Sequence, residues 1–154
     1  MIADVASRTA LIVAASRARA STGEGALCSD YFAYALAGPE GRALEEAVYR
    51  ARPAAPLYVA VRTAFLDAEV RRLTSAAFGL GQVVILGAGL DTRAARFAQD
   101  GVRFFEVDHP ATQADKRRRV SEIEGYPTDA AIWVPCDFGA EDFLVRLVES
   151  GFDT

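Results

Sequence analysis

Residues 82–89 read QVVILGAG, a short apolar run that stops at a pair of glycines. A run of β-branched residues that is apolar on both faces predicts a fully buried parallel strand. The glycines let the backbone turn tightly and let a ligand approach it closely. A helical stretch follows at about residues 91–100. Strand, turn and helix together predict the start of a doubly wound sheet, in which ligands bind beyond the carboxyl ends of the strands.

The alternation of strands and helices continues to residue 154. We expect strands at 102–107 and 132–136, with helices at 110–123 and 139–150. Such alternation implies a parallel sheet with right-handed crossovers. Three strands make a small sheet with a raw edge. This predicts either a truncated sequence or a partner over that edge, such as a second copy of the chain.

The first 80 residues contain few strand signals and are rich in alanine, leucine and arginine. Helical spacing and the Gly and Pro breaks predict helices at about 3–20, from Tyr31 to Gly38, from Pro39 to Arg52, and at 56–77. We therefore expect residues 1–80 to form a helical N-terminal cap or lead-in. Residues 81–154 would form the first half of a Rossmann-like cofactor-binding domain, and the whole would be one domain.

Composition excludes several classes of protein. The 154 residues are 51% hydrophobic and 25% charged, which suits one compact domain, and the net charge of -4 argues against binding nucleic acid. No apolar run reaches the roughly 20 residues that cross a bilayer. Residues 10–15 are apolar but lie between Asp4 and Arg17, which favours an amphipathic helix over an export signal. The two cysteines lack metal or redox spacing, so we expect no metal, buried thiols and a cytoplasmic protein.

Asp108 ends the second expected strand and lies 21 residues after Gly87. An acid at about this spacing typically accepts hydrogen bonds from ribose hydroxyls. The alternative is an aspartate that starts a turn before Pro110, and a Gly-x-Gly turn alone is also compatible with a purely structural role. The combination of the two features favours a nucleoside site.

The helix start after the glycine turn distinguishes between two nucleoside cofactors. Thr92 stands where a dinucleotide fingerprint has its third glycine, and Asp91 places a negative charge at the helix N-terminus. That charge disfavours a pyrophosphate, which needs an open helix start. It does not disfavour a zwitterionic amino acid beside a sulfonium. S-adenosylmethionine therefore fits better than a nicotinamide dinucleotide.

Three further residues are candidates for the cofactor site. Asp137 and Phe138 follow the third strand, where an acid can meet the adenine amino group and an aromatic ring can pack on the base; an ordinary strand-end turn is the alternative. Arg62 lies among apolar neighbours, and a buried arginine needs an anionic partner. That partner is either the cofactor carboxylate or an internal acid, Asp67 or Glu69.

Two other features are weaker signals. His109, the only histidine, is compatible with a general base, but a residue at the rim of the cofactor site is favoured. Residues 116–119 form a basic run on a helix. With a net negative charge, a solvated helix face is favoured over a nucleic-acid patch.

Residues 82–93 (QVVILGAGLDTR), 105–110 (FEVDHP) and 116–117 (KR) resemble the leucine carboxyl methyltransferase family, and most of all its bacterial branch of S-adenosylmethionine-dependent methyltransferases. That branch includes polyketide O-methyltransferases. Residues 61–67 (VRTAFLD) resemble the same branch. The resemblance implies an α/β, Rossmann-like class I methyltransferase fold: a parallel sheet with helices on both faces, preceded by a helical N-terminal segment. The family's domain extends beyond residue 154, so this chain would be its front half.

The resemblance also implies roles for individual residues. The glycine turn would face the methionine part of the cofactor, Asp108 would hold the ribose, and Asp137 with Phe138 would frame the adenine. Arg62 would pair with the cofactor carboxylate, and Arg17 matches a basic position near it. The implied cofactor-binding residues are Arg17, Arg62, Gly87, Ala88, Gly89, Asp108, Asp137 and Phe138.

The expected function is S-adenosylmethionine-dependent O-methylation of a carboxylate or hydroxyl on a small molecule. No catalytic residue is assigned, which agrees with a carboxylate acceptor that needs no base. One alternative is a truncated, non-catalytic cofactor-binding or assembly module. The other is an NAD-dependent oxidoreductase domain, which Thr92 disfavours.

Overall fold

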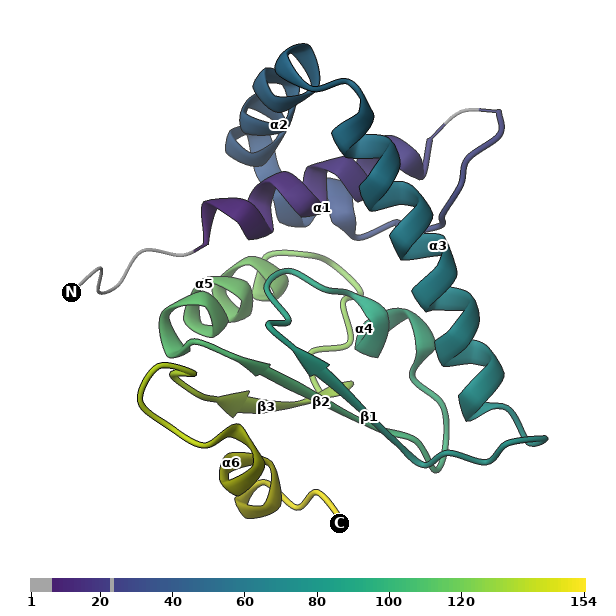
Figure 1. Cartoon of the computed structure of the whole chain (residues 1–154), viewed down its shortest axis with the longest axis vertical. Coiled ribbons are helices and arrows are strands. Elements are labelled where there is room, and N and C mark those ends of the chain that lie inside the picture. Colours follow the sequence, from purple (N-terminus) through teal and green to yellow (C-terminus); the bar gives the residue numbers. More distant parts are fainter. Residues whose placement is uncertain (1–6, 23) are drawn as a thin grey trace.

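The computed structural model describes residues 7–22 and 24–154. Three parallel strands form its sheet: β1 (Gln82–Leu86), β2 (Arg103–Asp108) and β3 (Ala131–Pro135), in the order β1-β2-β3. Each strand lies within one residue of its predicted position at either end. The α/β class and the parallel sheet are therefore confirmed (Figure 1).

Six helices surround the strands in the described part of the chain. Three of them precede the sheet: α1 (Arg8–Ala20), α2 (Ala33–Ala51) and α3 (Ala54–Thr74). The other three follow one strand each: α4 (Arg93–Phe97), α5 (Pro110–Ser121) and α6 (Phe143–Glu149). The expected first turn of the N-terminal helix, at residues 3–6, lies outside the described residues.

Local sequence explains where several helices begin and end. Gly38 has a φ of 60° and interrupts α2, at the Gly-Pro pair where the sequence predicts a break between two helices. The α4 helix is shorter than expected, because the chain becomes extended at Ala98. The α6 helix begins later than expected, because the Asp142 carboxylate caps it by accepting from the Leu144 amide at 2.8 Å.

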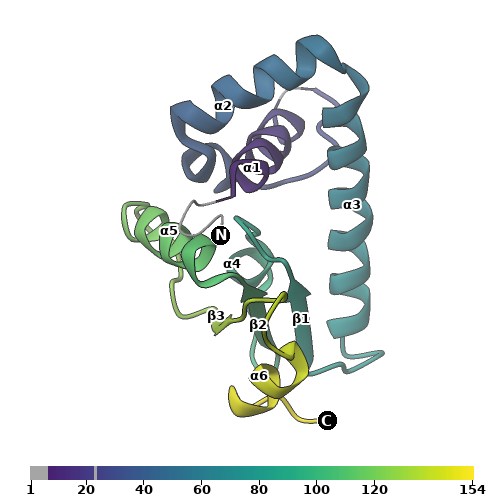
Figure 2. The same ribbon diagram turned by 60° about the vertical axis from the view of Figure 1, so that its left-hand side comes forward.

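Helices cover both faces of the sheet, as the sequence predicts (Figure 2). Successive side chains of a strand point to opposite faces. Phe105 and Val107 of β2 therefore pack with Leu147 of α6 on one face. Glu106 faces the other side, where Lys116 of α5 binds it.

The N-terminal helices share a hydrophobic cluster with the sheet half. Leu11 and Ala14 of α1 pack with Leu36 of α2, and the same cluster contains Leu90 from the loop after β1 and Val120 from α5. Figure 1 shows α1 lying across the end of the sheet where the strands finish. This packing places α1 directly over the glycine turn.

The expectation that β1 is fully buried is wrong. Its first four residues are only half-buried, and Leu86 is 52% exposed. The physical reason is its position in the sheet: β1 pairs with β2 on one side, and no described strand lies on its other side. An apolar sequence indicates that a strand can be buried, but the neighbours decide whether it is.

Candidate cofactor site

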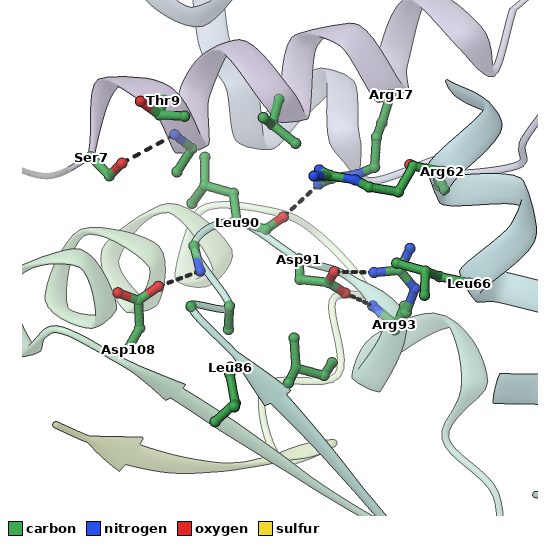
Figure 3. A pocket seen from close by; sticks show the side chains of 17 residues that line it. Ser7, Thr9, Arg17, Arg62, Leu66, Leu86, Leu90, Asp91, Arg93 and Asp108 are labelled. Atoms are coloured by element: carbon green, nitrogen blue, oxygen red, sulfur yellow. Dashed lines mark hydrogen bonds and ion pairs between the residues drawn. The ribbon is translucent and has the colours of Figure 1, made fainter. Parts of the chain in front are cut away.

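A cavity of about 490 Å³ opens where β1 ends, between α1, α3 and the loop that follows β1 (Figure 3). Its wall includes the end of β2. Six of the eight predicted site residues line it: Arg17, Arg62, Gly87, Ala88, Gly89 and Asp108. The structure thus brings together residues that are up to 91 positions apart in the sequence.

The glycine turn forms the floor of this cavity. Gly87 and Gly89 have φ angles of 63° and 54°, in the left-handed region that other residues rarely adopt. A Cβ atom at Gly89 would lie 3.1 Å from the Cβ of Ala10 in α1, so helix and loop are in close contact. The Ala88 amide donates to the Val107 carbonyl at 3.1 Å and ties the loop to β2. The turn therefore exposes backbone to the cavity in a fixed conformation.

Asp108 lies directly against this turn. Its Oδ2 accepts from the Gly89 amide at 2.5 Å, and its Oδ1 accepts from the His109 amide at 2.6 Å. A carboxylate has about four acceptor positions, so these two bonds leave acceptor capacity on a residue that lines the cavity. The loop after β1 and the acid that closes β2 face the same cavity.

Arg17 is buried and connects α1 to the loop that follows β1. Its Nε donates to Asp30 Oδ2 at 2.7 Å, and a terminal nitrogen donates to the Leu90 carbonyl at 2.6 Å. The sequence resemblance placed Arg17 near a cofactor carboxylate. In the structure Arg17 lines the cavity, but its guanidinium already forms an ion pair with Asp30.

Arg62 lies on α3 at the side of the cavity and is exposed, contrary to the expectation of a buried arginine. The physical reason is that α3 turns this face away from the core. Neither internal acid that the sequence offered as a partner binds it, because Asp67 pairs with Arg93 and Arg96 and Glu69 pairs with Arg72. Its guanidinium lies 5.7 Å from the centre of the Tyr58 ring. A cationic group thus remains at the cavity without an ion-pair partner among the described residues.

A buried polar network beneath the cavity has no counterpart in the sequence-based predictions. Asp30 accepts from Thr92 Oγ1 at 2.8 Å, and Asp67 of α3 accepts from Arg93 Nε at 2.8 Å and from Arg96 at 2.6 Å. These contacts join the loop before α2, the middle of α3 and the start of α4. Partners separated by 26 to 62 residues carry no local spacing signal, so sequence reasoning had no means of pairing them.

Asp91 occupies the start of α4. Its Oδ1 accepts from the Arg93 amide at 2.7 Å, and its other oxygen binds the Arg93 guanidinium. Burial opposes ionisation, but the charges of Arg93, Arg17 and Lys116 outweigh it and hold the pKa of the Asp91 carboxyl below its ordinary value. The acid therefore takes the first amide of this short helix, which is then not open to a phosphate.

The prediction of a solvated basic face at residues 116–119 is wrong for Lys116. It is 1% exposed, and its Nζ donates to Glu106 Oε2 and to the Asp91 carbonyl, each at 2.5 Å. The reason is that β2 presents Glu106 toward α5. Only Arg117 and Arg118 of the run are exposed. Lys116 thus connects α5, β2 and the segment that follows the glycine turn.

Asp137 and Phe138 do not line the cavity. They lie exposed in the segment after β3, where Asp137 Oδ1 accepts from the Gly139 amide at 2.9 Å in the manner of a strand-end turn. Their predicted contact with adenine remains a prediction. His109 Nδ1 accepts from the Ala111 amide at 3.2 Å and caps α5. In the described part of the chain, no group of three acids, histidines or cysteines is placed to hold a metal ion.

The fold and the cavity define a Rossmann-like α/β protein with a site at the carboxyl ends of its strands. Comparison with known families then identifies it further: a model of the leucine carboxyl methyltransferase family matches residues 10–154. The chain belongs to this family, as the sequence resemblance predicted.

Curated relatives agree with this assignment. One from Streptomyces coelicolor, named "Putative S-adenosyl-L-methionine-dependent methyltransferase", is 38% identical over 94% of this chain and 53% of its own length. Relatives of the same description from Mycolicibacterium gilvum and Mycolicibacterium paratuberculosis are 36% and 35% identical, over 56% and 50% of their lengths. The chain spans about half the length of the curated relatives it matches.

Proposed function

We propose that this chain binds S-adenosylmethionine in the cavity at the end of β1 and forms the cofactor half of an O-methyltransferase. The observation that carries the proposal is the contact between the Gly89 amide and the Asp108 carboxylate at one cavity wall, with the cationic Arg62 also lining the cavity. An adenosyl amino acid has a ribose diol and a carboxylate, and these two groups suit an acid and a guanidinium. The names of the curated relatives support the same cofactor.

The chain's own residues would bind and orient the cofactor. Asp108 has acceptor capacity for ribose hydroxyls, the backbone of residues 87–89 allows close approach, and Arg62 would pair with the carboxylate. The sulfonium of the bound cofactor supplies an electrophilic methyl group. The protein's contribution would be in-line positioning of the acceptor and exclusion of water.

The proposed acceptor is a carboxylate or hydroxyl group of a small molecule. A carboxylate arrives ionised and needs no base, whereas a hydroxyl needs one. The carboxylates that line the described cavity, Asp91 and Asp108, are both engaged in backbone hydrogen bonds. No catalytic residue is assigned among the described residues, which agrees with a carboxylate acceptor.

The proposed setting is the cytoplasm, with a small molecule rather than nucleic acid as partner. Both cysteines are free, which suits a reducing compartment. No helix in the described ranges has the length and apolar character to cross a membrane.

The rival cofactor is a nicotinamide dinucleotide, and one titration separates the two. We expect the chain to bind S-adenosylmethionine with one-to-one stoichiometry and to give no heat with NAD⁺ in isothermal titration calorimetry. Circular dichroism of the same sample establishes that it is folded. Binding of NAD⁺ would favour an oxidoreductase domain, and no binding of either ligand by a folded sample would favour a non-catalytic assembly module.

A further inference from the structure

Arg17 has one nitrogen that the described residues do not use. Its Nε donates to Asp30 at 2.7 Å, and its Nη2 donates to the Leu90 carbonyl at 2.6 Å. No described residue accepts from the third nitrogen, Nη1, and Arg17 lines the cofactor cavity. Because a guanidinium is a rigid plane, hydrogen bonds from two of its nitrogens fix the position of the third. Arg17 therefore keeps a cationic donor in a fixed position at the cavity.

Asp30 sets this position, because its carboxylate is also held by other elements. Its side chain is fully buried. Its Oδ1 accepts from the Ala33 amide at the start of α2, and its Oδ2 accepts from Thr92 Oγ1 at the N-cap of α4. The Asp30 amide donates to Ser21 Oγ at the end of α1, at 2.9 Å. The carboxylate that faces Arg17 is therefore fixed independently of Arg17.

The two arginines that line the cavity differ in how they are held. Figure 3 shows Arg17 extending from α1 and Arg62 extending from α3. Arg62 is exposed and has no ion-pair partner among the described residues, whereas Arg17 is paired and buried. A side chain that is already fixed loses less rotamer freedom when it binds a ligand. Arg62 supplies charge to the cavity, and Arg17 supplies a donor with a defined direction.

We propose that Asp30 is a positioning residue, which holds Arg17 so that its Nη1 donates to the carboxylate of the cofactor's amino acid part. This inference rests on the proposed function and adds the residue that orients the carboxylate contact. Asp30 does not itself line the cavity. Its effect is therefore confined to ligands that carry the carboxylate. A direct electrostatic effect would have the opposite sign, because the negative charge of Asp30 repels an anion.

A matched pair of ligands tests this role. S-adenosylhomocysteine carries the carboxylate, whereas 5′-methylthioadenosine keeps the nucleoside and the neutral sulfur but lacks the amino acid part. Isothermal titration calorimetry measures both affinities for the wild type and for Asp30→Asn. We expect Asp30→Asn to weaken binding of S-adenosylhomocysteine by about 10-fold or more, because a hydrogen bond to a charged group is lost. Binding of 5′-methylthioadenosine should be unchanged.

Two further variants separate positioning from loss of stability. Asp30→Glu keeps the charge but has a longer side chain, so it should displace Arg17 and weaken binding of S-adenosylhomocysteine alone. It also gives the answer if circular dichroism shows that Asp30→Asn is unfolded. Glu45→Gln is the matched control, because buried Glu45 pairs with Arg19, which is also on α1 but does not line the cofactor cavity. This control should lower stability and leave the ratio of the two affinities unchanged.

Three results would overturn the inference. S-adenosylhomocysteine could bind the Asp30 variants as tightly as the wild type, or both ligands could weaken by the same factor, which would indicate a purely structural role. Tighter binding of S-adenosylhomocysteine by Asp30→Asn would show that charge, rather than position, governs the site. A folded wild-type protein that binds neither ligand would contradict the proposed function itself, so that failure is distinct from the other three.

Discussion

Asp108→Ala is expected to weaken S-adenosylmethionine binding by about 10- to 150-fold. Hydrogen bonds to a charged group contribute about 1.5–3 kcal/mol, and about 1.36 kcal/mol corresponds to a factor of ten. The change removes the proposed ribose acceptor and the anchor of the Gly89 amide together. Isothermal titration calorimetry measures the loss, and circular dichroism checks that the variant is folded.

Two variants separate these effects of Asp108. Asp108→Asn keeps an acceptor oxygen for the Gly89 amide and is expected to bind with an affinity between those of the wild type and Asp108→Ala. Asp129→Ala removes an acid from an exposed turn and should leave the affinity unchanged. An Asp108→Ala protein that binds as tightly as the wild type would contradict the assignment of the ribose site.

Lys116→Met is expected to lower the free energy of unfolding by about 3–5 kcal/mol. Removing one partner of a buried ion pair leaves the other charge uncompensated, and such a loss typically lowers stability by about 3–5 kcal/mol. Lys116 and Glu106 are each only 1% exposed, and the variant also frees the Asp91 carbonyl. Urea denaturation followed by circular dichroism measures the change.

Matched variants test whether the unpaired charge is the cause. Lys116→Met combined with Glu106→Gln removes both charges and is expected to recover most of the lost stability. Arg118→Met breaks an exposed ion pair with Asp115 and should cost less than about 1 kcal/mol. If Lys116→Met costs no more than Arg118→Met, the buried pair does not stabilise the protein as described.

The contribution of the Glu106–Lys116 pair to protein stability changes with pH in a defined direction. Burial raises the pKa of the Glu106 carboxyl above the ordinary value of 4.5, although the Lys116 charge opposes the shift. The folded protein therefore keeps a proton that the unfolded chain loses, and stability from this group falls as pH rises from 4.5 through the raised value. Lys116→Met removes the opposing charge, so its stability should fall over a wider pH range than that of the wild type.

Local signals predict the strands and the glycine turn well. β1 is an apolar run between glycines, and β3 is an apolar run that ends at a proline. β2 (RFFEVD) mixes apolar and charged residues and ends at an acid, so the residues at the strand ends mark all three. These local signals do not indicate which strands are neighbours in the sheet. For this reason they overestimate the burial of β1, which depends on a neighbouring strand rather than on its own residues.

Charged residues show the limit of sequence reasoning more sharply. Gly87 and Asp108 belong to one strand-helix-strand unit. Their spacing is therefore a local signal, and it predicts that both residues lie at one cavity. The burial of Lys116 depends on which β2 residue faces α5, and the exposure of Arg62 depends on how α3 packs. The pairing of Asp30 with Arg17 and Thr92 joins separate elements. Such contacts require the folded chain.

Backbone amide shifts measured by NMR during a titration with S-adenosylmethionine test the central claim most directly. The proposed site predicts that the largest shifts fall on Gly87, Gly89 and Asp108, because these residues line the cavity together. A second cavity, of about 270 Å³, lies between α1, α2 and α3 and is lined by Tyr49 and Leu57. Shifts that gather there, or that leave the glycine turn unmoved at saturation, would contradict the account.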